Sequence, residues 1–285
     1  MSGIEERKLR IALVQQPAGP DKAENVRRGL EAMDRAAADG VGMVAFAELA
    51  FEPFYPQRPA AGSPIELAEP VPGPTTEAFA RKARELGVVT LINLFERDGD
   101  RTYDCSPVLD ADGSLLGRTR MAHITDYDCF HERGYYAPGD GGPTVYETRV
   151  GRIGVAICYD RHYPEYMRAL ALRGADLVVV PQAGALGEWP EGLYEAEMRV
   201  AAFQNGYFVA LCNRVGKEDR LTFAGESFVC DPAGRVIARA PELKGHMLVA
   251  DLDLGQVAGS NARRLFLPDR RPELYRDWLD EPAGS

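Results

Sequence analysis

Cys158 is the residue whose type and surroundings best suit nucleophilic chemistry. It ends an apolar run that is typical of a buried strand (IGVAIC), and a helix is expected to begin soon after it, near Tyr163 and Pro164. Ligands of open α/β sheets bind at the carboxyl ends of the strands. A helix N-terminus also stabilises a nearby thiolate through its dipole and its free N–H groups. The position of Cys158 therefore predicts attack of a thiolate on an electrophilic carbon.

The other reactive side chains follow no pattern of a metal or cofactor site. The chain has five cysteines, an odd number, and Cys105, Cys129, Cys212 and Cys230 are widely spaced without a CxxC pair. This argues against a disulfide framework and a structural zinc site. The four histidines show no ligand spacing, and no GxGxxG or phosphate loop follows a strand. We expect no metal, no cofactor, and a structural role for the other four cysteines.

Short apolar runs alternate with helical patterns in the first half of the chain. Apolar residues recur at helical spacing between Pro20 and Gly40, and Gly87 ends a second helical pattern. The turn Asp110-Ala-Asp-Gly113 has the residues of a hairpin. We predict helices over 20–40 and 75–86, and strands over 10–14, 42–47, 88–94, 106–109 and 114–119.

The second half repeats this scheme. We predict helices over 164–173 and 191–205, and strands over 151–158, 176–181, 208–213, 227–230 and 236–239. The predicted fold is an α/β four-layer α-β-β-α sandwich with mixed strands and two internally related halves. No low-complexity linker separates the halves, so we expect a single domain over residues 1–285. Its core spans about 8–255, and a C-terminal arm over about 256–285 packs across another surface.

Composition narrows the class of partner. Of the 285 residues, 45% are hydrophobic and 27% are charged, and 33 Lys and Arg stand against 43 Asp and Glu for a net charge of −10. A chain of this charge is poorly suited to nucleic acid or to an anionic membrane surface, because both require phosphate neutralisation. No apolar run approaches the length of a membrane span, and the polar N-terminus lacks a signal peptide. We expect a cytoplasmic enzyme with a small-molecule substrate.

Four segments, in order along the chain, carry a resemblance to a known family. They are VAFAELAFEPFYP, GRTRMAHITDYDCFHERGYYAPGD, GRIGVAICYDRHYPE and RVAAFQNGYFVALCNRVG. Together they resemble the nitrilase superfamily, the carbon–nitrogen hydrolases that use a Glu-Lys-Glu-Cys site, over roughly residues 8–255. The resemblance is closest to the amidohydrolases of N-carbamoyl amino acids and amines, of the β-ureidopropionase and N-carbamoylputrescine amidase type.

The resemblance implies a role for three residues. Cys158 matches the nucleophile, Glu48 the general base and Glu132 the second glutamate. An amide carbon is a poor electrophile, so a cysteine thioester intermediate divides hydrolysis into acylation and deacylation. A carboxylate must accept the thiol proton, pass it to the leaving amine and later activate water. The apolar surroundings of Glu48 favour a raised pKa, as a base of this kind requires.

Met121 stands where the family has its catalytic lysine. A methionine can neither donate a hydrogen bond to the oxyanion nor hold a positive charge near the glutamates, which by analogy costs about 10²–10³ in rate. In an extended segment Arg120 points away from the face of Met121, whereas Thr119 and His123 share that face. Lys217 and Arg214 are cations of another loop whose distance the sequence leaves open. Another cation in its place, altered chemistry, reduced activity and an engineered substitution all remain open at this stage.

The residues after the nucleophile bear on the substrate. The backbone N–H of Tyr159 is a candidate oxyanion donor, and in related carbamoylases an arginine near Arg161 binds the substrate carboxylate through a bidentate pair. Aromatic residues such as Phe54, Tyr55 and Trp189 are candidate pocket walls.

The leading hypothesis is hydrolysis of a small linear amide, an N-carbamoyl amino acid or amine. The alternatives are a family member that lost hydrolysis and serves as a binding or interaction protein, and an amidase or nitrilase with another substrate class. The family also implies a homo-oligomer, a dimer or a higher assembly.

Overall fold

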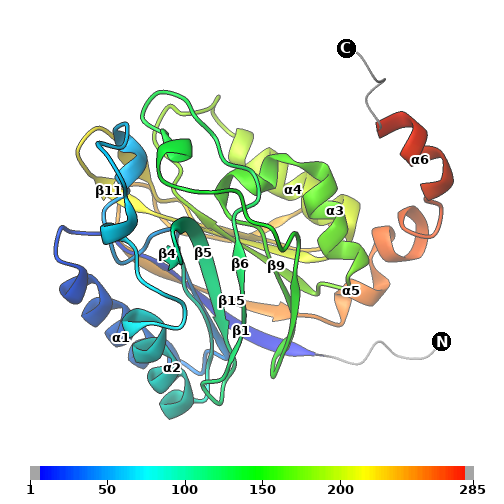
Figure 1. Cartoon of the computed structure of the whole chain (residues 1–285). Helices are drawn as coiled ribbons and strands as arrows, with labels where there is room; N and C mark the ends of the chain where they lie inside the picture. The colour runs from blue at the N-terminus through cyan, green and yellow to red at the C-terminus, as the bar shows by residue number, and fades with distance from the viewer. Residues whose placement is uncertain (1–6, 280–285) are drawn as a thin grey trace.

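The computed structural model describes residues 7–279. The strands of the first half of the chain, together with β15 from near its end, form a seven-stranded mixed sheet (Figure 1). Parallel strands β1, β2 and β3 form its centre, and β15, β5, β4 and β6 extend it with antiparallel pairings. The strands are β1 (Lys8–Gln15), β2 (Met43–Phe46), β3 (Val89–Leu91), β4 (Leu94–Asp98), β5 (Arg101–Leu109), β6 (Leu115–Arg120) and β15 (His246–Asp253). Helices α1 (Lys22–Ala38) and α2 (Pro74–Leu86) connect the three parallel strands.

The second half builds a six-stranded sheet on the same plan. Strands β8, β9 and β10 are parallel and are connected by α3 (Pro164–Leu172) and α4 (Leu193–Asn205). The strands of this sheet are β7 (Val145–Thr148), β8 (Gly151–Val155), β9 (Leu177–Gln182), β10 (Phe208–Asn213), β13 (Phe228–Cys230) and β14 (Val236–Arg239). A two-stranded sheet, β11 (Val215–Lys217) and β12 (Thr222–Ala224), follows β10. Each half thus contains one β-α-β-α-β unit, as predicted.

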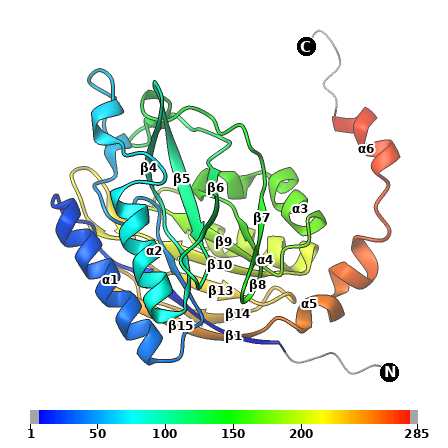
Figure 2. The same cartoon turned by 60° about the horizontal axis from the view of Figure 1, so that its bottom comes forward.

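Alternation along the strands explains the four layers. In β9, Leu177 and Val179 belong to the core between the two sheets, whereas Val178 and Val180 pack under α3 and α4. Strands β1 and β2 pack against β9 and β10 across that core, and α1 and α2 cover the outer face of the first sheet (Figure 2). The α-β-β-α sandwich is therefore the observed fold.

Local signals set the helix ends. The Asp21 carboxylate accepts hydrogen bonds from the N–H groups of Ala23 and Glu24 at the start of α1. Helix α2 begins at Pro74 and ends at Gly87, which is left-handed with φ 68°. The hairpin between β5 and β6 turns at Asp110–Gly113 as predicted.

Two predicted strands end earlier than expected. The strand predicted over 151–158 ends at Val155, and Cys158 begins a 3₁₀ turn, Cys158–His162. The strand predicted over 88–94 divides into β3 and the start of β4, because the ladder to β5 is interrupted at Ile92 and Asn93. In both places the apolar run continues beyond the ladder, since burial does not require strand pairing.

The C-terminal segment leaves the sandwich beside α3 and α4. It contains α5 (Gln256–Gly259), a π-helical turn (Ala262–Phe266) and α6 (Pro272–Leu279), which stands away from the body (Figures 1 and 2). The predicted arm is present up to Leu279, and its last residues lie outside the described part. Within residues 7–279, no helix is long and apolar enough to cross a membrane.

Candidate active site

Glu48 and Cys158 follow strands of the two facing sheets. Glu48 comes soon after β2 and Cys158 soon after β8. Both residues are buried, and each side chain acts on the pKa of the other. The sandwich therefore brings the predicted nucleophile and base together, although 110 positions separate them in the sequence.

Cys158 is held in a strained conformation. Its φ is +40°, which is rare for a residue with a side chain and is typical of functional turns. The guanidinium of Arg161 donates from Nη1 to the carbonyl oxygen of Cys158 at 2.8 Å. Burial, and next the charge of Glu48, raise the pKa of the Cys158 thiol well above its usual range. The expected thiolate stabilisation by a helix N-terminus is thus outweighed, and the protonated thiol is favoured.

The pKa of Glu48 suits general acid–base chemistry. Burial raises the pKa of its carboxyl group to about 7, and the nearby charge of Glu132 acts in the same direction. A base with a pKa near the working pH is effective both in accepting and in returning a proton.

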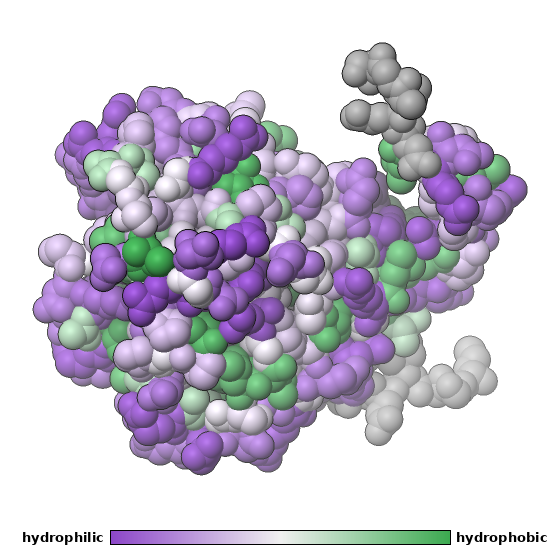
Figure 3. All heavy atoms as spheres, viewed as in Figure 1, coloured by the Kyte–Doolittle hydropathy of each residue, from purple (hydrophilic) through white to green (hydrophobic). Residues whose placement is uncertain are grey.

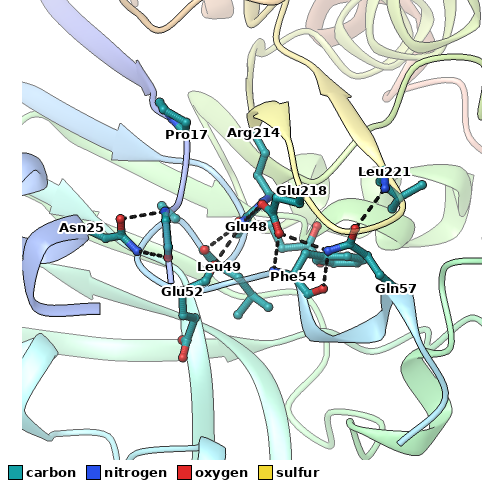
Figure 4. A network of polar contacts seen from close by, with 12 residues as sticks. Pro17, Asn25, Glu48, Leu49, Glu52, Phe54, Gln57, Arg214, Glu218 and Leu221 are labelled. Carbon is teal, nitrogen blue, oxygen red and sulfur yellow. Dashed lines mark hydrogen bonds and ion pairs between the residues drawn. The ribbon is translucent and has the colours of Figure 1, made fainter. Parts of the chain in front are cut away.

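Arg214 holds the turn that carries Glu48 (Figure 4). This arginine follows β10, is buried, and donates from Nη1 to the Glu48 carbonyl oxygen at 2.9 Å and from Nη2 to the Glu52 carbonyl oxygen at 3.1 Å. It also bonds the Leu49 carbonyl oxygen and the Glu218 carboxylate. Arg214 is therefore near the site, but its donors act on the turn rather than on the carboxyl group of Glu48.

Asn93 holds the same turn from the other side. Leu49 is left-handed, with φ +43°, and its N–H donates to Asn93 Oδ1 at 2.7 Å. The Nδ2 of Asn93 then donates to Asp104 Oδ1 at 2.6 Å and to Ser106 Oγ at 3.0 Å. The residues between β3 and β4 thus connect the turn of Glu48 to two polar side chains of β5.

Glu132 lies in a 3₁₀ turn, Glu132–Gly134, within the long connection between β6 and β7. It is buried, and its Oε2 accepts only a long hydrogen bond from the Thr125 N–H, at 3.4 Å. Burial, and next the charge of Asp104, raise the pKa of Glu132 well above its usual range. Because Glu132 also acts on the pKa of Glu48, the two predicted glutamates share one pocket.

Sequence reasoning missed Asp104 and Tyr136. Asp104 is buried in β5, and its carboxyl group is in hydrogen-bond contact with that of Glu48. Tyr136 is also buried, its hydroxyl has no hydrogen-bond partner among the described residues, and the charges of Asp104, Glu48 and Glu132 act on it. An aspartate within the apolar run of β5 was a visible signal, but only the pairing of β5 shows which face it occupies.

Met121 is buried at the end of β6. Its N–H donates to the Asp104 carbonyl oxygen at 3.0 Å. Arg120 binds Glu96 on the other side of the strand, at 2.7 Å, as the alternation predicted. His123 instead turns to Asp160, with Nδ1 2.7 Å from Oδ1. No Lys, Arg or His side chain among residues 7–279 forms a hydrogen bond or ion pair with the carboxyl groups of Glu48, Asp104 or Glu132.

The guanidinium of Arg161 is bound by other residues of the protein. Its Nη1 donates to Gln182 Oε1 at 2.9 Å as well as to the Cys158 carbonyl oxygen, and its Nε lies 3.3 Å from Glu197 Oε2. Its Nη2 is buried and has no hydrogen-bond partner among the described residues. Tyr159, directly after the nucleophile, is half-buried.

Glu188 lies beside the site, between two tyrosines. It accepts hydrogen bonds from the hydroxyl of Tyr127, at 2.5 Å, and from that of Tyr194. Its charge acts on the pKa of Cys158 and of Glu132. Among the predicted wall residues, Trp189 packs edge-to-face against Tyr127 with ring centroids 5.8 Å apart. The surroundings of the thiol are therefore acidic and aromatic.

Comparison with known proteins gives a consistent result. The sequence pattern of the family described as carbon-nitrogen hydrolase matches residues 10–261. The N-carbamoylputrescine amidase of Solanum lycopersicum is 33% identical over 284 residues, which cover 95% of this chain and 94% of the relative.

Two solved structures are similar throughout. The crystal structure of a carbon–nitrogen hydrolase from Helicobacter pylori has a TM-score of 0.86 and 28% identity, and covers 96% of this chain and 99% of its own. A mutant of the amidase from Nesterenkonia sp. AN1, with the acetamide moiety of fluoroacetamide covalently added at the active-site cysteine, has a TM-score of 0.80 and 27% identity; 95% of this chain and 97% of that one are covered.

Proposed function

Because the chain belongs to the carbon–nitrogen hydrolase family and is an amide-hydrolysing enzyme, we propose that it cleaves a small N-carbamoyl amine or amino acid through a thioester on Cys158. The observation that carries this proposal is the burial of the Glu48 carboxyl group beside the Cys158 thiol, close enough for each to act on the pKa of the other. A thiol of raised pKa becomes a nucleophile only beside a base, and Glu48 is the base within reach.

The proposed reaction has two steps. In acylation the sulfur of Cys158 bonds to the carbonyl carbon while the thiol proton passes to Glu48, and the same proton leaves with the amine or ammonia as the C–N bond breaks. In deacylation Glu48 takes a proton from water, whose oxygen attacks the thioester carbon, and the proton returns to sulfur as the C–S bond breaks. Acylation leaves Glu48 ionised for deacylation, and deacylation restores the thiol for the next acylation.

Three further residues have proposed roles around this centre. The Tyr159 N–H adjoins the nucleophile and is proposed to donate to the oxyanion. Arg161 fixes the Cys158 carbonyl group, and its remaining Nη2 is proposed to meet a polar group of the substrate. Glu132 is proposed to hold the substrate amide through the oxygen that has no donor among the described residues.

The pocket favours an amine over an amino acid. Glu188 places a carboxylate beside the thiol, and the guanidinium of Arg161 already has Glu197 as its ion-pair partner. A cationic substrate tail is attracted by such surroundings, whereas a carboxylate tail competes with Glu197. Of the two substrate classes, the N-carbamoyl amine is therefore the preferred one.

Ammonia release tests the proposal. N-carbamoylputrescine, N-carbamoyl-β-alanine and simple amides are incubated with the wild type and with Cys158→Ala, and free ammonia is measured. The expected result is release by the wild type, greatest with the carbamoyl amine, and none by Cys158→Ala. Equal release by both proteins, or release by neither, contradicts the proposed reaction.

Met121 supports a second candidate function, a family member that binds amides without turning them over. Under this alternative the wild type forms no adduct and releases no ammonia, while Met121→Lys restores both. Intact mass measured after addition of substrate separates the two, because the proposed enzyme gains the mass of the acyl group on Cys158.

We also propose that the protein forms a homo-oligomer through the outer face of α3 and α4. The α6 helix faces a groove of about 890 Å³ between itself and these helices. Hydrophobic side chains gather where the C-terminal segment meets the body (Figure 3). The exposed apolar residues here are Leu172, Val200, Phe266, Trp278 and Leu279. A surface of this kind is typical of protein interfaces.

A further inference from the structure

Within residues 7–279, three buried carboxyl groups lie around Cys158 without an ion-pair partner. They belong to Glu48, Asp104 and Glu132. Both carboxyl oxygens of Glu48, Oδ2 of Asp104 and Oε1 of Glu132 receive no hydrogen bond from an N–H or O–H donor of the described residues. Three ionised carboxylates cannot share such a pocket, because burial and mutual repulsion both disfavour their charged forms. Protons must therefore be retained in the group.

The hydrogen bonds of Asn93 indicate where one proton lies. Asn93 Oδ1 is occupied by the Leu49 N–H, so Nδ2 is the atom that faces Asp104. Asp104 Oδ1 accepts that bond, which leaves Oδ2 for the contact with Glu48. Two carboxyl groups attract each other only when one proton lies between them. The free oxygen of Asp104 is the atom placed to carry it.

Building on the proposed hydrolase, we propose that Asp104 is a positioning residue: it carries the shared proton, donates it in a hydrogen bond to Glu48 and so keeps the base ionised and directed at Cys158. This supplies the neutralising effect that a lysine at position 121 would have on the glutamates. It does not supply the oxyanion donor, which the Tyr159 N–H is proposed to provide.

The pKa shifts agree with a proton held on Asp104. Burial, and next the charge of Glu48, raise the pKa of Asp104 well above its usual range. The hydrogen bond from Asp104 lowers the pKa of Glu48 against the larger effect of burial. The other titratable or charged groups that act on the pair from neighbouring elements are Glu132, Cys158, Asp160, Tyr136 and Arg214.

The test compares two variants of Asp104 that have almost the same shape. Asp104→Asn keeps a donor towards Glu48, because Asn93 still orients the other atom, but it has no proton to lose. Asp104→Leu keeps the branching at Cγ, with somewhat larger terminal groups, and removes the donor. Tyr136→Phe is the matched control, since it removes a polar oxygen from the same pocket but no shared proton.

The readout is the pH dependence of Cys158 alkylation by iodoacetamide, followed by intact mass from pH 5 to 10 with Cys158→Ala as the blank. The acid midpoint reports ionisation of Glu48. We expect Asp104→Asn and Tyr136→Phe to keep the wild-type midpoint within about half a pH unit. Asp104→Leu raises it by about one to two units, which corresponds to loss of a hydrogen bond to a charged group.

A lowered acid midpoint overturns the inference. If Asp104 is itself ionised, both Asp104→Asn and Asp104→Leu remove a negative charge and lower the midpoint. Should Asp104→Leu not fold, the sign with Asp104→Asn alone still decides. Met121→Lys added to Asp104→Leu is expected to return the midpoint to the wild-type value or below. A midpoint that stays raised contradicts the claim that Asp104 provides the neutralising effect of a lysine at position 121.

This readout is independent of amide hydrolysis. A wild type that alkylates with the expected profile but releases no ammonia leaves the role of Asp104 standing and rejects the proposed reaction. Conversely, Cys158-dependent ammonia release with a lowered midpoint in Asp104→Asn keeps the reaction and rejects the role of Asp104.

Discussion

At the scale of residues, the proposed role of Glu48 as the base predicts a pH dependence of the reaction. Its pKa is raised to about 7, and the base must be ionised to accept the thiol proton. We expect kcat/KM for the carbamoyl amine to fall about tenfold per pH unit as the pH drops below about 7. Glu48→Gln removes the base and should lower the rate roughly 10²–10⁴-fold while flattening this dependence. A wild-type profile that is flat from pH 5 to 8 is incompatible with Glu48 as the base.

The same carboxyl groups link stability to pH. The pKa values of Glu48, Asp104 and Glu132 are raised in the folded state, so the folded protein holds protons that the unfolded chain releases. Their contribution to stability is complete below the unfolded values of about 4 and is lost as the pH rises through about 7 and beyond.

Met121→Lys should reverse this dependence of stability on pH. An ammonium among the three carboxyl groups is unfavourable while they are neutral and favourable once they ionise. The difference in Tm between Met121→Lys and wild type is therefore expected to increase from pH 5.5 to 8.5, as measured by calorimetry. A difference that is constant or decreases over this range shows that position 121 does not face the carboxyl groups.

At the scale of elements, Arg214 connects the second sheet to the turn after β2. It contacts three carbonyl oxygens of that turn and the Glu218 carboxylate, all in buried surroundings. Arg214→Met leaves these acceptors without a donor, and we expect a loss of about 3–5 kcal/mol in the free energy of unfolding. Because Glu48 is held through its own carbonyl group, ammonia release should fall as well, even under conditions where the variant remains folded.

An exposed pair provides the control for Arg214. Arg58 and Asp219 join the same two regions of the chain, with Nη2 3.0 Å from Oδ1, but both side chains are at least half exposed. Arg58→Ala should cost only about 0–1 kcal/mol. Urea unfolding of both variants measures the contrast, and similar losses would mean that the position of Arg214 in the buried turn has no special effect.

The same turn shows what a sequence can and cannot predict about a site. Cys158 was predicted from the apolar run that it ends, because the ends of buried strands are visible in the sequence, whereas the role of Glu48 was implied by the family resemblance. Asp104 was missed because its role depends on which strands pair with β5. Arg214 was considered only as a cation of unknown distance. Contacts that join segments far apart in the chain arise from the packing of the two sheets, which local periodicity does not encode.

The missed strands have a related cause. Strands β11 and β12 have three residues each, too few for an alternation to be recognised. Strand β7 is a half-buried edge of its sheet. Strand β15 alternates clearly but lies in the segment that was considered the end of the core, and it pairs along the whole of β1. Central parallel strands are buried on both faces and were therefore predicted more reliably than edges.

At the scale of the whole molecule, the shape of the C-terminus raises the question of what covers it. Helix α6 has no buried residue, and Trp278 and Leu279 are about two-thirds exposed, at 67% and 65%. The groove beside it is lined by apolar residues of α3 and α4 together with Arg168, Arg270 and Arg276. An amphipathic helix and a partly apolar groove on one chain can complement each other in a symmetric pair, since each copy offers both surfaces.

We therefore expect the protein to be at least a dimer in solution, with α3, α4 and α6 in the interface. Val200, which is 51% exposed on α4, lies in the groove. Val200→Glu buries a carboxylate against the apolar residues of a second copy and should shift the assembly to monomer at micromolar concentration, as measured by light scattering after size exclusion. Leu67→Glu introduces the same charge at a residue of similar exposure, 45%, outside the groove and should leave the assembly intact.

A wild type that is monomeric, or a loss of assembly in both variants, contradicts this interface. Because the groove also contains Arg161 and His162, close after the nucleophile, the monomeric variant is expected to lose part of its ammonia release as well.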